Sequence, residues 1–186
     1  MTYFVTGATG FIGRYLVQSL LQKGKGTIYV LVRPKSVGKL DELREFWGKD
    51  SLKRVVPIKG DLGLPKLGVA RGDLTKLKGK VKHFYHLGAV YDLEASAEAM
   101  EKANITGTRG ALEFAEAVNA GCFHLVSSIA AAGLYRGTFT EDMFEEAEEL
   151  EHPYHRTKHD SEAMVRANGR IPFRVYRPGA VLGHSQ

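Results

Sequence analysis

The chain has 186 residues, of which 44% are hydrophobic and 25% are charged, and its formal net charge at pH 7 is +5. This length and composition suit one soluble domain with a complete hydrophobic core and exclude a disordered or collagen-like chain. No apolar stretch approaches the length of a membrane span, and the N-terminus lacks the features of a signal peptide, so we expect a cytoplasmic protein. The basic residues are scattered, which argues against nucleic-acid binding and favours phosphate-bearing small molecules.

An apolar strand at 3–6 runs directly into a glycine-rich turn and an amphipathic helix that stops at Gly24. Glycine permits a tight turn and a close backbone approach to a pyrophosphate, whose charge the N-terminus of the helix stabilises. A lone glycine triplet also fits an ordinary turn, but the flanking strand and helix favour dinucleotide binding. The residues expected to contact the dinucleotide are Thr6, Gly7, Thr9, Gly10, Phe11, Ile12 and Gly13.

The rest of the chain alternates apolar, β-branched runs with helical patterns. Strands are predicted at 27–33, 54–58, 81–87, 123–128 and 173–179, and helices at about 37–47, 93–120 and from 154 onward. We expect the long helix to break near 104–110, and segment 63–80 gives no clear prediction. The alternation predicts an α/β fold, a Rossmann-type doubly wound parallel sheet in a three-layer α/β/α arrangement, with ligands at the carboxyl ends of the strands. Residues 1–186 are then one NAD(P)-binding domain.

The end of the second predicted strand indicates which dinucleotide would bind. NAD-binding Rossmann domains usually place an acidic residue there to hold the ribose hydroxyl, whereas this chain has Arg33, with Lys35 and Arg14 nearby. A guanidinium binds phosphate through paired charge-assisted hydrogen bonds, so we expect NADP (NADPH) rather than NAD. The alternative is that Arg33 and Lys35 only solubilise a loop. Asp61, at the end of the third strand, either accepts a hydrogen bond from the adenine or caps the next segment.

Two further features are interpreted structurally. The single cysteine, Cys122, lies in the apolar run 118–126, and one cysteine can neither form an internal disulfide nor build a metal site, so we expect it in the core and expect no metal. Seven acidic residues fall between Glu141 and Glu151 without any Lys or Arg. We interpret them as a solvated face, and the alternative is a mobile flap over the substrate.

Tyr154 and Lys158 stand four residues apart at the start of a predicted helix, so their side chains project from one face. A nearby ammonium stabilises phenolate and lowers the pKa of tyrosine, which makes tyrosine usable as a general acid or base. Ser128 ends the fifth predicted strand, where its hydroxyl can hold the carbonyl oxygen that tyrosine protonates. Ser127 is a near-equivalent candidate. The Tyr–Lys spacing alone is a weak signal.

Seven motifs in order along the chain resemble the extended short-chain dehydrogenase/reductase family. They are ThrGlyAlaThrGlyPheIleGly (6–13), AspLeu (61–62), HisLeuGlyAla (86–89), AsnIleThrGlyThr (104–108), SerSer (127–128), TyrHisArgThrLys (154–158) and ArgProGly (177–179). Two stretches, 30–35 and 60–68, look most like the branch of fatty acyl and thioester reductases, the NAD-binding, male-sterility-type branch. Members of that branch reduce acyl thioesters with NADPH to aldehydes or alcohols.

The resemblance implies a role for each matching residue. Tyr154 would be the proton donor, Lys158 would bind the nicotinamide ribose and tune Tyr154, and Ser128 would position the substrate carbonyl. Ser128 is preferred over Ser127 because its distance to Gly133 suits the family pattern. Asn104 matches a helix asparagine of the catalytic set, or is simply a helix start. The further residues expected to bind the cofactor are Leu62, Leu87, Gly88, Ala89, Arg177, Pro178 and Gly179.

Extended members carry a C-terminal substrate-binding region after the ArgProGly strand, and this chain stops at Gln186. We therefore expect a fragment of a longer polypeptide, or a short form completed by a partner; a homodimer would use the helix predicted from Leu93. The leading hypothesis is an NADPH-dependent oxidoreductase acting on a carbonyl or acyl thioester. The alternatives are a nucleotide-sugar epimerase or dehydratase, a hydroxysteroid-type dehydrogenase, and a non-catalytic NADP-binding sensor or scaffold.

Overall fold

A computed structural model describes residues 1–90 and 94–183 of the chain. One sheet of six parallel strands has the order β3-β2-β1-β4-β5-β6. The strands are β1 (Tyr3–Thr6), β2 (Ile28–Val32), β3 (Val55–Lys59), β4 (His83–His86), β5 (Phe123–Val126) and β6 (Phe173–Tyr176). Strand order runs outward in both directions from the neighbouring strands β1 and β4. The prediction of a doubly wound Rossmann-type sheet is therefore confirmed.

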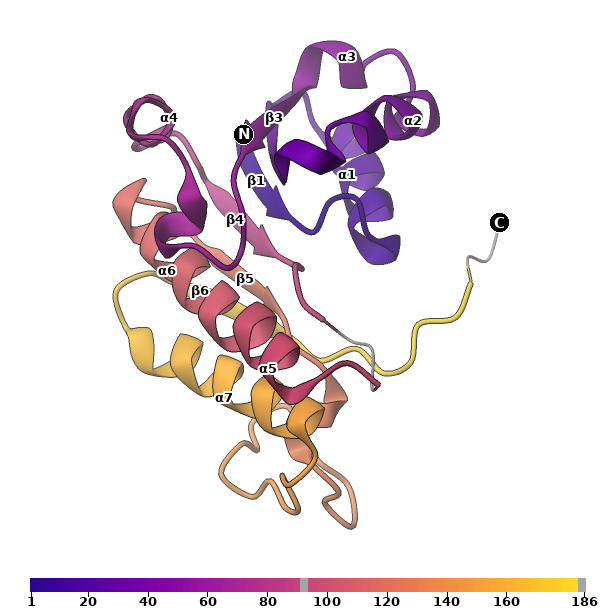
Figure 1. The fold of residues 1–186 in the computed structure, drawn as a ribbon, viewed down its shortest axis with the longest axis vertical. Coiled ribbons are helices and arrows are strands. Elements are labelled where there is room, and N and C mark those ends of the chain that lie inside the picture. The colour runs from indigo at the N-terminus through magenta and orange to yellow at the C-terminus, as the bar shows by residue number, and fades with distance from the viewer. Residues whose placement is uncertain (91–93, 184–186) are drawn as a thin grey trace.

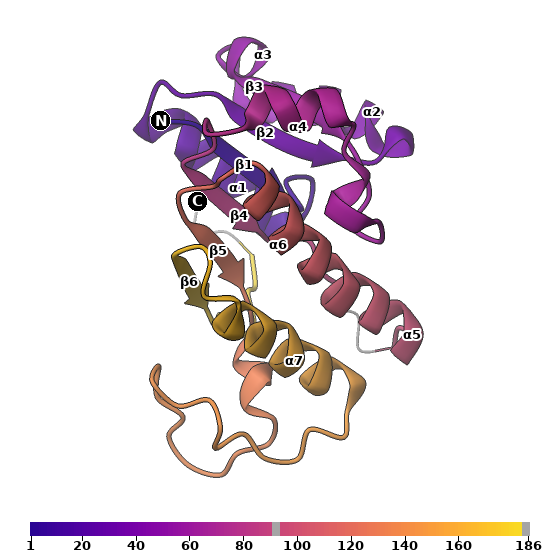
Figure 2. The ribbon, with the colours of Figure 1, turned by 90° about the vertical axis from the view of Figure 1, so that its left-hand side faces the viewer.

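Helices cover both faces of this sheet, in the predicted three layers (Figures 1 and 2). On one face lie α1 (Phe11–Lys23) and α2 (Gly38–Trp47), and α3 (Ser51–Arg54) leads into β3. On the other face lie α4 (Arg71–Leu77), α6 (Gly107–Ala117) and α7 (Pro153–Asn168), which occupy the front of Figure 2. Among the described residues no helix has the length and apolar character needed to cross a membrane.

Burial explains why the strands read as continuous apolar runs. All residues of β1 and β2 are buried, because helices cover both faces of a parallel sheet. The two edge strands differ: β3 contains Pro57, which lacks an N–H and is tolerated at a sheet edge, and β6 has no fully buried residue. The sheet thus has a dry centre, whose strand ends at β1, β4 and β5 carry the site described below.

The long helix differs from the prediction of a break near 104–110. Helix α5 (Ala97–Met100), a π-helical stretch (Glu101–Thr106) and α6 follow one another without interruption. The glycines serve close packing instead: a Cβ atom on Gly110 would lie 2.8 Å from the carbonyl oxygen of Leu64. The predicted start of this helix at Leu93 lies outside the described residues. The helix therefore continues through its glycines, which stand where another segment packs closely against it.

The Gly- and Lys-rich segment 63–80 has structure that its sequence did not reveal. A short turn (Pro65–Gly68) precedes α4, and Leu67 and Leu77 are both fully buried. Leu67 has φ +60°, a backbone conformation uncommon for a leucine. Burial of that side chain in the core thus outweighs the local preference of its backbone.

Cys122 does not lie in the core, where we expected it. It is half-buried at the amino end of β5, and it belongs to neither core cluster of buried side chains. Its neighbours are two histidines, His83 at the start of β4 and His124 in β5. Burial, together with the charges of His83 and Arg174, lowers the pKa of His124 to about 4, so this imidazole is neutral at pH 7.

Candidate active site

A cavity of about 1090 Å³ opens at the carboxyl ends of the strands. Seventeen of the predicted site residues line it: Gly7, Thr9, Gly10, Phe11, Ile12, Gly13, Arg33, Asp61, Leu62, Leu87, Gly88, Ala89, Ser128, Tyr154, Lys158, Pro178 and Gly179. Five others, Thr6, Arg14, Lys35, Asn104 and Arg177, are not in its lining. Residues from both ends and the middle of the chain therefore meet at the edge that the fold class predicted.

The glycine turn between β1 and α1 has the close packing that its sequence implied. Gly7 has φ +71°, and a Cβ atom there would lie 2.8 Å from the backbone nitrogen of Gly88. A Cβ atom on Gly13 would overlap the carbonyl oxygen of Gly7 and lie 2.8 Å from Cα of Ala8. Gly10, the residue before α1, brings no capping side chain, so the first amides of the helix remain available to an anion. This cradle fits a pyrophosphate.

Gly13→Ala tests this cradle. The added methyl group must displace the Gly7 carbonyl, so we expect the free energy of unfolding to fall by about 1–3 kcal/mol. We also expect nucleotide affinity to fall, because the displaced carbonyl belongs to the turn itself. Urea denaturation and nucleotide titration measure the two effects. Gly72→Ala, where the added Cβ meets nothing within 4 Å, is the matched control: it should leave nucleotide affinity unchanged and, because Gly72 lies in helix α4, should not lower the free energy of unfolding.

Thr6 supports the turn from below rather than lining the cavity. Its Oγ1 accepts hydrogen bonds from the backbone nitrogens of Leu87 (3.2 Å) and Gly88 (3.1 Å) and also contacts Nδ1 of His86 (2.8 Å). His86 is buried, its pKa is lowered by burial to about 3, and its Nε2 lies 3.1 Å from Oγ1 of Thr108. This chain of contacts fixes the ends of β1 and β4 against each other beneath the cavity floor.

The three basic residues that we expected near a 2′-phosphate do not lie together. Arg33 follows β2, is exposed and lines the cavity. Lys35 is exposed outside the lining. The guanidinium of Arg14 lies over three aromatic rings, 5.1 Å from the centroid of Phe11, 4.9 Å from Tyr15 and 5.6 Å from Phe46. Cation–π packing thus directs Arg14 to the α1–α2 surface, away from the cavity.

Asp61 caps the segment that follows it, which is one of the two interpretations weighed for it, and its contact with an adenine stays a prediction. Its Oδ1 accepts a hydrogen bond from the backbone nitrogen of Gly63 at 2.9 Å, which caps the local turn. Asp61 also lines the cavity, as does Lys102 on the π-helical stretch, a cation that joins Arg33 and Lys158 in the lining and was not expected from the sequence. Lys102 falls within a helical pattern, and nothing in its local sequence distinguishes it from a solvent-exposed lysine.

Tyr154 and Lys158 lie one turn apart at the start of α7, and both line the cavity. Lys158 is 6% exposed, and its Nζ donates to the carbonyl oxygen of Val126 at 3.3 Å. Burial lowers the pKa of Lys158 to about 8, although the charge of Glu162 opposes this shift. At neutral pH the ammonium form still predominates, and it lies on the same helical face as the phenol.

The two serines after β5 have different partners. Ser127 donates its hydroxyl to Oε2 of Glu162 at 2.8 Å and is 3% exposed. Ser128 accepts a hydrogen bond from the backbone nitrogen of Ala130 at 3.1 Å, which leaves its own hydroxyl proton for another acceptor. Both residues line the cavity. The geometry therefore favours Ser128 over Ser127 as a donor to a bound ligand.

Asn104 is a clamp between segments rather than a cavity wall or a helix start. Its Oδ1 accepts from the backbone nitrogen of Val90 at 2.8 Å, and its Nδ2 donates to the carbonyl oxygen of Val90 at 3.1 Å. Nδ2 also lies 3.1 Å from Oγ1 of Thr157 in α7. Asn104 is 2% exposed, in the middle of the π-helical stretch. It holds the segment after β4 against the helix that carries Tyr154 and Lys158.

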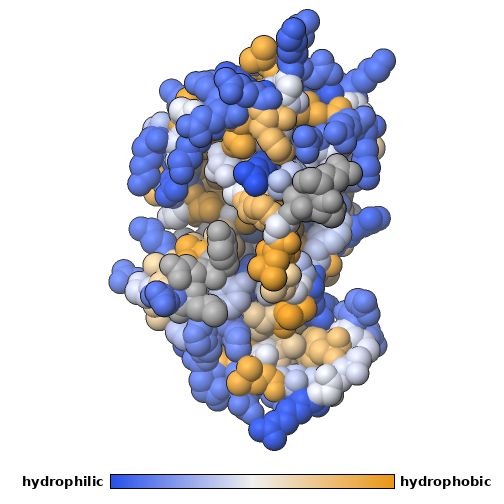
Figure 3. All heavy atoms as spheres, turned by 90° about the vertical axis from the view of Figure 1, so that its right-hand side faces the viewer, coloured by the Kyte–Doolittle hydropathy of each residue, from blue (hydrophilic) through white to orange (hydrophobic). Residues whose placement is uncertain are grey.

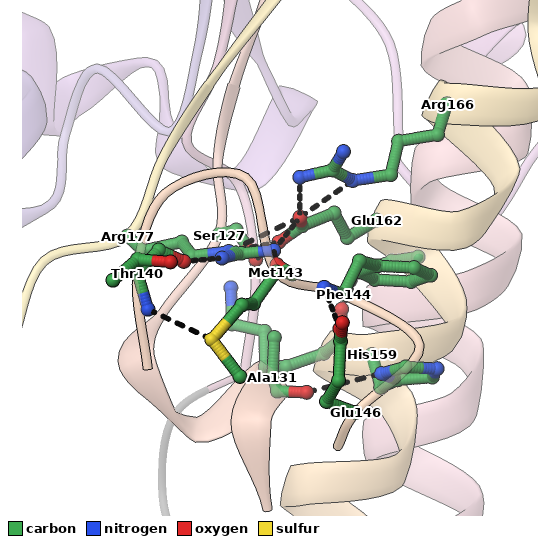
Figure 4. A network of polar contacts seen from close by, with 12 residues as sticks. Ser127, Ala131, Thr140, Met143, Phe144, Glu146, His159, Glu162, Arg166 and Arg177 are labelled. Atoms are coloured by element: carbon green, nitrogen blue, oxygen red, sulfur yellow. Dashed lines mark hydrogen bonds and ion pairs between the residues drawn. The ribbon is translucent and has the colours of Figure 1, made fainter. Parts of the chain in front are cut away.

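Arg177 also points away from the cavity, toward Glu162 (Figure 4). Glu162 has a fully buried side chain and accepts hydrogen bonds from Ser127, from Nε of Arg166 (2.8 Å) and from Nε and Nη2 of Arg177 (3.1 and 2.6 Å). Burial alone would raise the pKa of Glu162, but the bonds from Arg177, Ser127 and Arg166 outweigh it and lower that pKa. Glu162 was not expected from the sequence, where its only signal is its place four residues after Lys158.

The same arginine holds the acidic segment 141–151. Nη2 of Arg177 donates to the carbonyl oxygen of Met143 at 2.9 Å, and Phe144 is 8% exposed and stacks on His159 at 4.3 Å between ring centroids (Figure 4). All seven acidic residues of the segment are exposed, as a solvated face requires. None of them contributes to the cavity lining, so the cavity as it stands gives no support to the flap interpretation.

The cavity extends onto an apolar surface at the C-terminal side. Residues 180–183 line it, and Val181 and Leu182 are 47% and 90% exposed. The face that carries this segment shows hydrophobic surface across its middle, between hydrophilic margins (Figure 3). Apolar side chains that gather at the surface beside a cavity are typical of a ligand-binding groove or an interaction surface.

Fold and cavity are those of an NAD(P)-binding domain of the extended short-chain dehydrogenase/reductase type. The family model described as male sterility protein matches residues 5–186, nearly the whole chain. The chain belongs to this family. The resemblance noted from its motifs is thereby confirmed, including its fatty acyl reductase branch.

Individual relatives agree with this assignment. The chain is 34% identical over 197 residues to a linear gramicidin synthase of Brevibacillus parabrevis, a match that covers 98% of this chain and 4% of that protein. It is 33% identical over 131 residues to a putative fatty acyl-CoA reductase, CG8306, of Drosophila melanogaster, covering 62% of this chain and 25% of that protein. The solved terminal R domain of the myxalamid PKS-NRPS pathway is 31% identical, with a TM-score of 0.89 over 100% of this chain and 50% of that chain. The chain thus spans half or less of these relatives.

Proposed function

We propose that this chain is the cofactor-binding and catalytic half of an NADPH-dependent reductase that acts on an acyl thioester or another carbonyl compound. One observation carries the proposal: a single cavity is lined by the glycine turn, by Arg33 and by Ser128, Tyr154 and Lys158. The turn would hold a pyrophosphate and the other residues a 2′-phosphate and a carbonyl. The fold supplies the binding site, and the polar side chains supply the reaction.

The preference for NADPH rests on Arg33 alone among the three cations first considered. Its guanidinium is exposed at the end of β2 and faces the cavity, where it can bind a 2′-phosphate through two hydrogen bonds. No acidic side chain follows β2 within the turn Pro34–Ser36. Lys102, which lines the same cavity, adds a second positive charge for the phosphate groups.

Arg33→Ala should therefore lower the affinity for NADPH much more than the affinity for NADH. We expect NADPH to bind roughly tenfold more weakly, the loss of one charge-assisted contact, and NADH to bind almost as before. Parallel titrations of both cofactors by fluorescence, with wild type and variant, measure the ratio. Lys35→Ala, a cation outside the lining, is the control and should leave the ratio unchanged. Equal affinity of the wild type for NADH and NADPH would contradict the proposal.

When bound, the nicotinamide supplies the hydride for the carbonyl carbon. Tyr154 then donates its phenolic proton to the carbonyl oxygen, where negative charge develops. The Lys158 ammonium, held against the Val126 carbonyl, stabilises the phenolate that remains. The Ser128 hydroxyl donates to the same carbonyl oxygen and fixes its place before proton transfer. Asn104 and Glu162 act through position, since each holds α7 to a neighbouring segment.

The substrate class is inferred from a relative and from the apolar rim of the cavity. One relative is named as a putative fatty acyl-CoA reductase, and an acyl-CoA is a thioester of a long apolar chain. Exposed Val181 and Leu182 suit such an acyl chain at the cavity mouth. We propose that further polypeptide, in the same chain or in a partner, covers this rim. Incubating the complete polypeptide with NADPH and a long-chain acyl-CoA, and following NADPH oxidation, tests the activity directly.

A further inference from the structure

A second group of ligand-type side chains lies at the amino ends of the strands, at the other end of the sheet from the cavity. His83, Cys122 and His124 each offer one ligand atom, and these atoms all lie within 4.8 Å of one another. None of the three lines the active-site cavity. The strand register explains the grouping: Phe84 pairs with Phe123, so His83 and Cys122 lie side by side, and His124 follows two residues later on the same face.

We propose that His83, Cys122 and His124 bind one zinc-like divalent transition-metal ion. Two imidazoles and a thiolate are ligands that Zn²⁺ prefers, and three protein ligands leave a fourth position for water or an exogenous group. Nδ1 of His83 and Nε2 of His124 lie 2.9 Å apart. Two nitrogens on a tetrahedral zinc ion lie about 3.3 Å apart, so the ion replaces this hydrogen bond with a small movement of the rings.

The surroundings orient one ligand in the way that metal sites require. Nδ1 of His124 lies 2.9 Å from the hydroxyl of Tyr176 in β6, and the ring stacks on Tyr85 with centroids 4.3 Å apart. A metal-binding histidine usually donates its second ring N–H to a neighbouring acceptor. If Nδ1 donates to the Tyr176 hydroxyl in this way, the lone pair of Nε2 faces His83 and is free to bind the ion. His83 and Cys122 are only half-buried, which leaves an approach for the ion from solvent.

One charged residue opposes the ion, and it provides a control. Arg174 pairs with His124 in the register between β5 and β6, and its charge affects both His83 and His124. A guanidinium this close disfavours a bound cation. Removing the charge should therefore strengthen metal binding, whereas removing a ligand should weaken it. Opposite effects from two neighbouring residues separate a specific site from general surface adsorption.

Titration of the metal-free chain with Zn²⁺ by calorimetry, and with Co²⁺ by absorption, tests the proposal. We expect one equivalent of Zn²⁺ to bind, and bound Co²⁺ to show sulfur-to-metal charge-transfer absorption. Cys122→Ser should abolish that absorption and lower Zn²⁺ affinity at least about tenfold, and Arg174→Gln should raise the affinity. His83→Asn, a half-exposed position, repeats the ligand test if Cys122→Ser folds poorly. NADPH binding should be the same in all variants, because the cluster lies away from the cavity.

The outcomes are decisive in either direction. Absence of saturable Zn²⁺ binding overturns the proposal, as does binding that neither Cys122→Ser nor His83→Asn weakens. The result is independent of the proposed reductase activity, since no turnover is measured. If the site holds, Zn²⁺ should also raise the melting temperature of the wild type but not of Cys122→Ser, because a ligand stabilises the folded state that binds it. The expectation that a single cysteine excludes a metal would then be wrong, because strand pairing supplies the other ligands.

Discussion

Replacing Tyr154 with phenylalanine should lower turnover of an acyl thioester by about 10²–10⁴-fold while NADPH affinity changes little. The variant keeps the aromatic ring that lines the cavity and removes only the hydroxyl group, with the proton that it would donate. With no general acid, the developing oxyanion must take its proton from water. The measurement is single-turnover NADPH oxidation in the complete polypeptide, with cofactor titration of the 186-residue chain alongside. Separate binding and turnover data distinguish a catalytic residue from one that only holds the cofactor.

Tyr29→Phe is the matched control for this substitution. Tyr29 is a buried tyrosine of the central sheet, in the core and outside the cavity lining, so loss of its hydroxyl should leave turnover within about threefold of the wild type. Unchanged turnover in Tyr154→Phe would remove the proton-donor role. Intact NADPH binding without turnover of any carbonyl substrate in the wild type would instead favour a non-catalytic, nucleotide-binding protein. Each result assigns the cavity to a different function.

Local patterns were sufficient wherever a residue's role depends on its own segment. The turn around Gly7 and Gly13 could be predicted because strand, glycines and helix are contiguous, and the steric reason for Gly13 lies within the turn itself, at the carbonyl of Gly7. Tyr154 and Lys158 could be predicted because one helical turn brings them to one face. The parallel sheet could also be predicted from local patterns, because strands and helices alternate along the chain and such crossovers are right-handed.

The sequence did not reveal the partners of a side chain where those partners come from distant segments. Arg14 is adjacent to the glycine turn, yet Phe46 on α2 helps to draw its guanidinium to the other side of α1. Arg177 follows a strand that leads to the cavity, yet Glu162 on α7 takes its guanidinium. Cys122 reads as a core residue because its flanks are apolar, and only pairing of β4 with β5 places it beside histidines. Such choices depend on tertiary contacts that no local pattern encodes.

The ion pairs of Glu162 with Arg166 and Arg177 should contribute strongly to the free energy of unfolding. Glu162→Gln should lower the free energy of unfolding at pH 7 by about 3–5 kcal/mol, because the neutral amide leaves Arg177 and Arg166 without their anion. The side chain of Glu162 is fully buried, and those of Arg177 and Arg166 are 13% and 31% exposed, so solvent compensates Arg177 poorly. Urea denaturation with constant slope measures the change. Glu116→Gln is the matched control, since its partner Arg170 is 75% exposed and such a pair contributes at most about 1 kcal/mol.

The pH dependence of this difference has a defined sign. The pKa of Glu162 is lowered in the folded state, so the unfolded carboxylate takes up a proton first as the pH falls. The stabilisation by Glu162 is therefore complete well above its unfolded pKa of about 4.3 and is lost as the pH falls through the lower folded value. The difference between wild type and Glu162→Gln should accordingly shrink in acid and reach its full size by about pH 6, where the Glu162 carboxylate is ionised in both states. A loss no greater than that of Glu116→Gln, or a difference that grows in acid, would contradict the assignment.

Since Glu162 also holds Ser127 at the end of β5 and Arg177 at the acidic segment, the same substitution should loosen both. Hydrogen exchange of residues 139–146 should therefore increase with the loss of stability.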